Sequence, residues 1–129
     1  MTKIYVASSL YNKTNVKALY KYLAYMQSTI TYDWTTHGGV NDEASLREIG
    51  LKEFQGVVDC DVLVMLMPAR LGSHVELGIA LALGKPVVII TGSEDYEKKS
   101  FYFLDHVNII RDIDSLKEAL DKIMEQEND

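Results

Sequence analysis

The chain has 129 residues, of which 47% are hydrophobic and 25% charged, a composition typical of soluble globular proteins. This length predicts one domain that spans residues 1–129. The net charge of −6 provides no basic surface to neutralise phosphates, so neither a nucleic acid nor an anionic membrane is expected as a partner. The net charge does not exclude a small anionic ligand that is held by a few backbone amides and one or two cations. The single cysteine, Cys60, excludes an internal disulfide and a multi-cysteine zinc site.

Membrane and secretion signals are not found in the sequence. No apolar run approaches the roughly 18 residues that a membrane span needs. The N-terminal residues 1–6 lead directly into a predicted strand, without the apolar region of a signal peptide. We therefore expect a cytoplasmic protein.

Strands and helices are predicted to alternate along the chain. In chain order, strands are expected at residues 3–7, 29–34, 61–67, 87–91 and 107–110, and helices at about 14–28, 42–59, 74–83 and from 114 or 115 onward. The acidic end, residues 125–129, is expected to fray. This alternation predicts an α/β fold with a parallel sheet and right-handed crossovers.

The order of the strands is also predicted. Residues 29–34 alternate between polar and apolar, which is the pattern of a half-exposed edge strand. An edge position for the second strand favours a flavodoxin-like or Rossmann-like three-layer sandwich, with five strands in the order 2-1-3-4-5. Its switch point lies between the first and third strands, so loops 8–15 and 68–73 should flank one ligand-binding crevice.

Glu76 is the most unusual residue of the central segment. Every other residue from Val75 to Leu83 is apolar or glycine, so we expect this helix to be enclosed by protein on most sides. The carboxylate is expected in the first helical turn, just past the end of a strand. The alternative is a capping box, because Ser73 and Glu76 fit the S-x-x-E pattern. The amides of the helix N-terminus, beside Gly72 and the cation Arg70, could bind an anionic group.

A second carboxylate is predicted on a buried helix face. At 100° per residue, one inward stripe of the helix at 42–59 holds Glu53 near its middle. The apolar members of this predicted stripe are Leu46, Ile49, Gly50, Phe54 and Val57. The alternative role for Glu53 is a salt bridge with a lysine or arginine.

The remaining candidate residues give weaker indications of function. His37, His74 and His106 lie on different elements without metal-ligand spacing, so solvated or capping roles are expected and no metal site. His74 is the exception by position, since it could line the crevice beside Glu76. Trp34 could either stack on a base or pack internally. The G-x-G-x-x-G and P-loop patterns are absent, and no cofactor is predicted.

Residues 71–90, LGSHVELGIALALGKPVVII, together with CDVLVML at 60–66, resemble the signature of the nucleoside 2-deoxyribosyltransferase family. The resemblance is closest to its branch of 2′-deoxynucleoside 5′-phosphate N-hydrolases, and it extends to IYVASSL at 4–10 and EFQGVVDCD at 53–61. It implies cleavage of the bond between base and sugar, with Glu76 as the nucleophile. The expected partner is a small nucleoside or nucleotide.

The resemblance also implies roles for further residues. Glu53 stands where the family usually has an aspartate, and Tyr5 matches the aromatic residue of the first strand. The residues expected to bind substrate are Ser8, Ser9, Arg70, Gly72, Ser73, His74 and, from a neighbouring subunit, Ser100. The family, and the apolar residues 101–103, imply a homodimer or higher homo-oligomer. Met67-Pro68 replaces an acid that the transferase branch often carries, which weakens a transferase reading.

Two carboxylates suit this chemistry, because retaining glycosidases place a nucleophile and an acid/base about 5 Å apart. Glu76 would form a glycosyl ester, while Glu53 could hold a proton or position Glu76. Water would then complete a hydrolysis, and a second base a transfer. The sequence therefore predicts an N-glycosidase of a (deoxy)nucleoside 5′-monophosphate or nucleoside. The alternatives are a deoxyribosyltransferase, a non-catalytic nucleotide-binding module and, less well supported, an NAD glycohydrolase.

Overall fold

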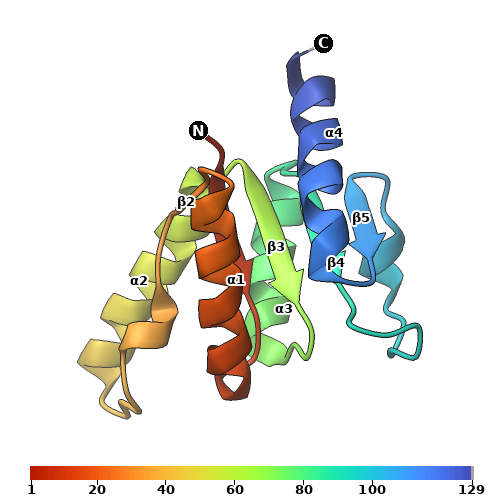
Figure 1. Cartoon of the computed structure of the whole chain (residues 1–129). Coiled ribbons are helices and arrows are strands. Elements are labelled where there is room, and N and C mark those ends of the chain that lie inside the picture. The colour runs from red at the N-terminus through yellow and green to blue at the C-terminus, as the bar shows by residue number, and fades with distance from the viewer. Residues whose placement is uncertain (129) are drawn as a thin grey trace.

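A five-stranded parallel sheet forms the centre of the computed structural model, which describes residues 1–128 (Figure 1). The strands are β1 (Lys3–Ala7), β2 (Thr29–Ile30), β3 (Val62–Leu66), β4 (Val87–Ile90) and β5 (Val107–Ile110). Their order is β2-β1-β3-β4-β5, and all neighbours pair in parallel. The predicted fold class and strand order are confirmed. That the chain forms one domain remains a prediction.

Helices cover both faces of the sheet. They are α1 (Lys13–Tyr25), α2 (Glu43–Asp59), α3 (Leu71–Ala82) and α4 (Leu116–Asn128). Helices α1 and α4 lie in front of the sheet in Figure 1, and α2 and α3 lie behind it, in contact with each other. Right-handed crossovers require this division, because the chain moves one way along the sheet through α1 and the other way through α2 and α3.

The core lies around the three central strands. All residues of β3 and β4, and four of the five in β1, are buried. These continuous apolar runs have no solvated face, as expected for strands covered on both sides. Polar side chains can therefore gather only beyond the strand ends, and the carboxyl ends of β1 and β3 adjoin at the predicted switch point.

The second strand is shorter than predicted. Only Thr29–Ile30 pairs with β1, and Trp34–Thr36 forms a short 3-10 helix instead. The Asp33 carboxylate accepts a hydrogen bond from the Thr35 amide at 2.9 Å and so caps this turn. The Trp34 indole donates to the Val6 carbonyl at 2.6 Å, which holds the ring against the end of β1. Side-chain hydrogen bonds thus override the strand pattern.

Helix α3 begins at Leu71, three residues earlier than predicted. Ser73 therefore lies inside the first turn, where its hydroxyl accepts a hydrogen bond from the Arg70 amide at 3.5 Å. Glu76 falls in the second turn, so the expected first-turn position is wrong. Because the helix does not start at Ser73, Glu76 does not close a capping box with it.

The outer surfaces of α2 and α3 differ from the expectation. Leu46 and Phe54 were predicted to face inward but are about half exposed, at 48% and 50%, and Gly50 is exposed too. The residues of α2 that are buried are Gly56 and Val57. Helix α3 is not enclosed on most sides, since Val75 is 63% exposed. These two helices present an apolar surface outward.

The C-terminal helix is longer than predicted. Helix α4 includes residues 125–128 and ends at Asn128, Asp129 lies outside the described residues, and the fraying of this end stays a prediction. Among residues 1–128, no helix combines the length and apolar character that crossing a membrane would require.

Candidate functional site

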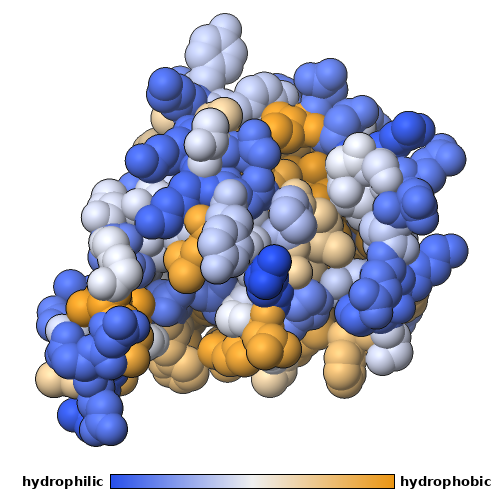
Figure 2. Space-filling model, turned by 90° about the horizontal axis from the view of Figure 1, so that it is seen from below, coloured by the Kyte–Doolittle hydropathy of each residue, from blue (hydrophilic) through white to orange (hydrophobic). Residues whose placement is uncertain are grey.

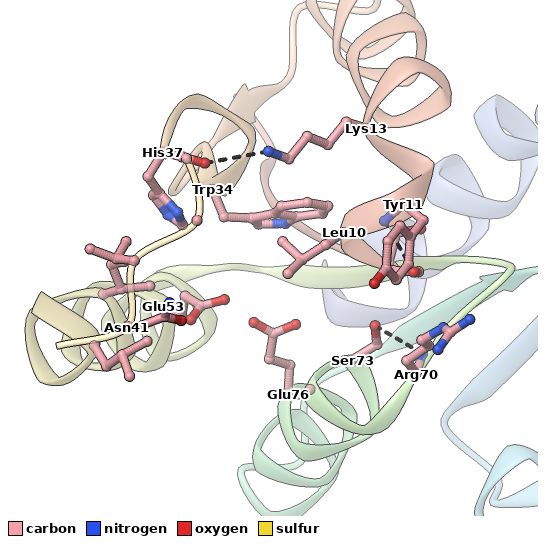
Figure 3. A pocket seen from close by; sticks show the side chains of 18 residues that line it. Leu10, Tyr11, Lys13, Trp34, His37, Asn41, Glu53, Arg70, Ser73 and Glu76 are labelled. Atoms are coloured by element: carbon pink, nitrogen blue, oxygen red, sulfur yellow. Dashed lines mark hydrogen bonds between the residues drawn. The ribbon is translucent and has the colours of Figure 1, made fainter. Parts of the chain in front are cut away.

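A cavity of about 510 Å³ opens at the carboxyl ends of β1 and β3 (Figure 3). Its walls come from the loop after β1, the segment 34–41 after β2, the inner side of α2, and the start of α3. These are segments far apart in the sequence that the parallel topology brings to one edge of the sheet. The cavity lies at the predicted switch point.

Glu76 projects into this cavity from α3 and is only 8% exposed. One of its oxygens, Oε2, accepts a hydrogen bond from the Tyr5 hydroxyl. Burial raises the pKa of Glu76 to about 8, and the nearby Glu53 carboxylate adds to the rise, whereas the hydrogen bond from Tyr5 opposes it. Perturbation by burial and by a second carboxylate inside a cavity is a mark of functional sites.

Glu53 reaches the same cavity from α2 and is half-buried. Figure 3 shows the Glu53 and Glu76 side chains pointing into one space from two different helices. Within the described part of the chain, no salt bridge involves Glu53, which removes the alternative structural role considered for it. The structure therefore holds two carboxylates at one cavity without a cation between them.

Tyr5 supports Glu76 from beneath. Its side chain is fully buried in β1 and does not belong to the cavity wall. Burial and the Glu76 carboxylate both raise the pKa of Tyr5, so the phenol keeps its proton and remains a hydrogen-bond donor. Any role of Tyr5 in chemistry passes through Glu76.

Five other predicted residues line one side of the cavity: Ser8, Ser9, Arg70, Gly72 and Ser73. The Ser8 hydroxyl donates to the Leu66 carbonyl at 2.7 Å and ties this loop to the end of β3. The Arg70 guanidinium lies 5.0 Å from the centre of the Tyr11 ring, a cation–π arrangement that leaves its N–H groups in the plane available. Together with the amides at the start of α3, this side is suited to an anion.

Two predicted substrate-binding residues lie elsewhere. His74 faces a neighbouring groove, where its Nδ1 donates to the Arg70 carbonyl and its Nε2 accepts from the Tyr102 hydroxyl, both at 2.7 Å. Ser100 is exposed at the start of a short 3-10 helix, Ser100–Phe103, and lines neither the cavity nor this groove. The fold does not bring either residue to Glu76 within one chain.

The structure adds His37 and Asn41 to the site, together with Trp34, for which the sequence had left stacking on a base and internal packing open. Trp34, His37 and Asn41 line the side of the cavity opposite Arg70, with Glu76 between (Figure 3). The Nε2 atom of His37 is buried and has no hydrogen-bond partner among residues 1–128, although a solvated or capping role had been predicted. The sequence feature that could have identified these residues is the Gly38-Gly39 loop, because this loop follows the carboxyl end of the second strand.

Metal-ligand clusters are not seen in this structure. No group of three or more histidine, cysteine, aspartate or glutamate side chains within residues 1–128 is arranged to hold a metal ion.

Three solved structures resemble this chain over nearly its whole length. The CMP N-glycosidase of Clostridium botulinum has 19% identity and a TM-score of 0.63, over 94% of this chain and 97% of its own. The 2-deoxyribosyltransferase of Bacillus psychrosaccharolyticus has 17% identity and a TM-score of 0.70, over 89% of this chain and 90% of its own. The 2-deoxyribosyltransferase of Leishmania mexicana has 18% identity and a TM-score of 0.64, over 95% of this chain and 98% of its own. This chain has their fold. The resemblance predicted from the sequence is confirmed at the level of the fold.

Sequence comparison adds no closer assignment. No protein-family model matches the chain, and no curated protein sequence matches it.

The buried carboxylate makes stability depend on pH. Glu76 titrates near 4.5 in an unfolded chain and at about 8 in the fold, so folding favours its neutral form. Between these pH values the native protein binds more protons than the unfolded one, and its stability falls as the pH rises. Relative to wild type, Glu76→Gln should therefore become progressively more stable up to about pH 8, and the difference should level off above it.

Urea unfolding of both proteins at about pH 4, 6 and 9 measures this difference, and the titrating groups that do not interact with Glu76 cancel in the comparison. A difference in unfolding free energy that is the same at all three pH values would contradict the burial of an ionisable Glu76.

Proposed function

We propose that this protein is an enzyme that breaks the N-glycosidic bond of a nucleoside 5′-monophosphate, with Glu76 as the nucleophile. The observation that carries the proposal is the buried Glu76 carboxylate, which a buried tyrosine holds by a hydrogen bond and which shares a cavity with Glu53. The similarity in fold to a CMP N-glycosidase and to 2-deoxyribosyltransferases supports it.

The two ends of the cavity suggest how the substrate lies. The cation Arg70 and the start of α3 suit the 5′-phosphate, and the opposite side offers Trp34 to stack on the base. His37 and Asn41 lie on that side and provide hydrogen-bonding groups for a base edge. The sugar then spans the middle, with its anomeric carbon at Glu76.

The first chemical step is a displacement at this carbon. A Glu76 oxygen attacks C1′, and the C–N bond breaks with its electron pair passing to the base nitrogen, which is protonated by Glu53. Because Tyr5 donates to Oε2, the other oxygen is the one left for attack. The positive charge that develops on the sugar favours the ionised carboxylate.

The second step releases the sugar. Glu53 removes a proton from water, the water oxygen bonds to C1′, and the ester bond to Glu76 breaks. A second base in place of water would give transfer. Met67-Pro68, where the transferase branch often has an acid, favours hydrolysis. A cytoplasmic location remains a prediction from the sequence.

Replacing the nucleophile tests the assignment. Glu76→Gln keeps the shape of the side chain but removes the attacking oxyanion, so base release should fall by about a thousandfold or more. The assay supplies cytidine, uridine and purine monophosphates, their deoxy forms, the free nucleosides and NAD, and measures released base by chromatography. Glu48→Gln, an exposed carboxylate on α2, serves as the control.

Near-normal turnover by Glu76→Gln would refute the nucleophile. Tight binding by the wild-type protein with recovery of intact ligand would instead favour a non-catalytic nucleotide-binding module.

Replacing Arg70 tests the proposed position of the 5′-phosphate. A charge-assisted hydrogen bond from a guanidinium contributes about 1.5–3 kcal/mol, so Arg70→Met should raise KM for a nucleoside monophosphate by about 10- to 100-fold. Turnover of the corresponding nucleoside should change little. Arg111→Met, at an exposed ion pair with Glu94, is the control. An equal effect on nucleotide and nucleoside would place the phosphate elsewhere.

We also propose that the outer surfaces of α2 and α3 pack against a second copy of the chain. The exposed apolar residues there are Leu51 and Phe54 of α2, Leu71 and Val75 of α3, and Leu83 just after α3. Figure 2, which views the carboxyl ends of the strands, shows apolar patches along its lower margin, below the polar centre. Exposed apolar patches of this kind mark interfaces. Ser100, exposed and remote from its own cavity, agrees with a role in a neighbouring subunit.

A charge on this surface should prevent association. Val75→Asp places a carboxylate on an exposed part of the patch without touching the cavity, and burial of an unpaired charge is costly. Sedimentation should show an oligomer for wild type and for the control Lys21→Asp on α1, and a monomer for Val75→Asp. A monomeric wild-type protein would overturn the proposal.

A further inference from the structure

We propose that Gly56 of α2 is a positioning residue: the missing side chain lets α2 press on the ring of Tyr5 and so aims the Tyr5 hydroxyl at Glu76. The catalytic meaning of this contact rests on the proposed function, whereas the contact itself belongs to the fold. Gly56 does not line the cavity, so any effect it has passes through Tyr5.

A methyl group at Gly56 would force its neighbours to shift. A Cβ atom there would lie 3.0 Å from Cδ2 and 3.1 Å from Cε2 of the Tyr5 ring, and 3.0 Å from Cβ of Tyr32. These separations are at the limit of what carbon atoms tolerate, since non-bonded carbons prefer about 3.5–4.0 Å. Helix and ring therefore touch directly, with nothing between them.

A second glycine in the same helix shows that this contact is specific. Gly50 also lies within α2, but a Cβ there would meet no atom within 4 Å. Glycine lowers helix stability relative to alanine at either position. Only at Gly56 does packing require it. The Thr31 hydroxyl, which donates to the Gly56 carbonyl at 2.7 Å, ties this turn of α2 to the residue that follows β2.

The Tyr5 ring has little freedom to avoid an added atom. Its backbone lies in β1, which pairs with β2 on one side and with β3 on the other, where Tyr5 is opposite Leu63. Its side chain is fully buried. The ring can yield only by rotation about its side-chain bonds, and such a rotation displaces the hydroxyl at the far end of the ring. Hydrogen bonds weaken steeply with such misalignment.

Loss of this alignment has a defined consequence at Glu76. The hydrogen bond from Tyr5 stabilises the ionised carboxylate against the effect of burial, so weakening the bond raises the pKa of Glu76 further. The ionised fraction at neutral pH then falls. In turnover, this predicts a kcat about tenfold lower, a KM that changes little, and a rise of activity with pH that is shifted to higher pH.

The test compares Gly56→Ala with Gly50→Ala, the same substitution on the same helix in open space. The readout is the pH titration of the Glu76 carboxyl carbon by NMR in free, ¹³C-glutamate-labelled protein, with the signal assigned by its loss in Glu76→Gln. We expect a pKa higher by about half a unit to one unit in Gly56→Ala, and no change in Gly50→Ala.

A double-mutant cycle with Tyr5→Phe separates positioning from a general effect on the fold. If Gly56 acts through the hydroxyl, Gly56→Ala should add nothing to the titration shift that Tyr5→Phe already causes. An unchanged titration in Gly56→Ala, or additive shifts in the double variant, would overturn the proposal. A titration shift as expected in a protein that releases no base would uphold the positioning and refute the proposed function.

A second variant covers the case in which Gly56→Ala does not fold. Thr31→Val removes the hydrogen bond to the Gly56 carbonyl and loosens α2 from Tyr5 without adding bulk at the ring. It should raise the pKa of Glu76 in the same direction, and an unchanged titration would again count against the proposal.

Discussion

The hydrogen bond between Tyr5 and Glu76 is the interaction on which the site depends. It joins the central strand β1 to helix α3 beneath the cavity floor, and it leaves a carboxylate buried without a cation. Burial of such a group is costly, and a single phenol offsets only part of that cost. The strand order makes the contact available, because β1 and β3 adjoin and α3 starts immediately after β3. The fold thus contains a buried carboxylate that lowers the stability of the protein, as functional sites commonly do.

Much of the architecture could be predicted because the buried strands carry strong local signals. Apart from the exposed Lys3 at the start of β1, the runs in β1, β3 and β4 are apolar on both faces, which identified central strands, and alternation after Thr29 placed β2 at the edge. The inward direction of Glu53 followed from helical spacing, and the place of Glu76 beside the cavity followed from its position just past the third strand at the switch point. These features depend on residues near one another in sequence or on topology alone.

The errors came where long-range contacts decide local structure. The Trp34 indole bonds to the backbone of β1, which turned an expected strand into a short helix and brought His37 to the cavity. Periodicity could not tell a buried apolar stripe of α2 from an exposed one, and Phe54 on the predicted inward stripe is 50% exposed. His74 was placed beside Glu76 by sequence distance, whereas 100° per residue turns it toward Tyr102 instead.

Helix α3 serves two surfaces at once, since its inner side carries Glu76 and its outer side is nearly free of charge. A second protein packed on the outer side would restrict the motion of the helix and so of Glu76. The geometry around Glu76 would then depend on protein concentration through the rigidity of one helix, even though every residue that lines the cavity belongs to a single chain.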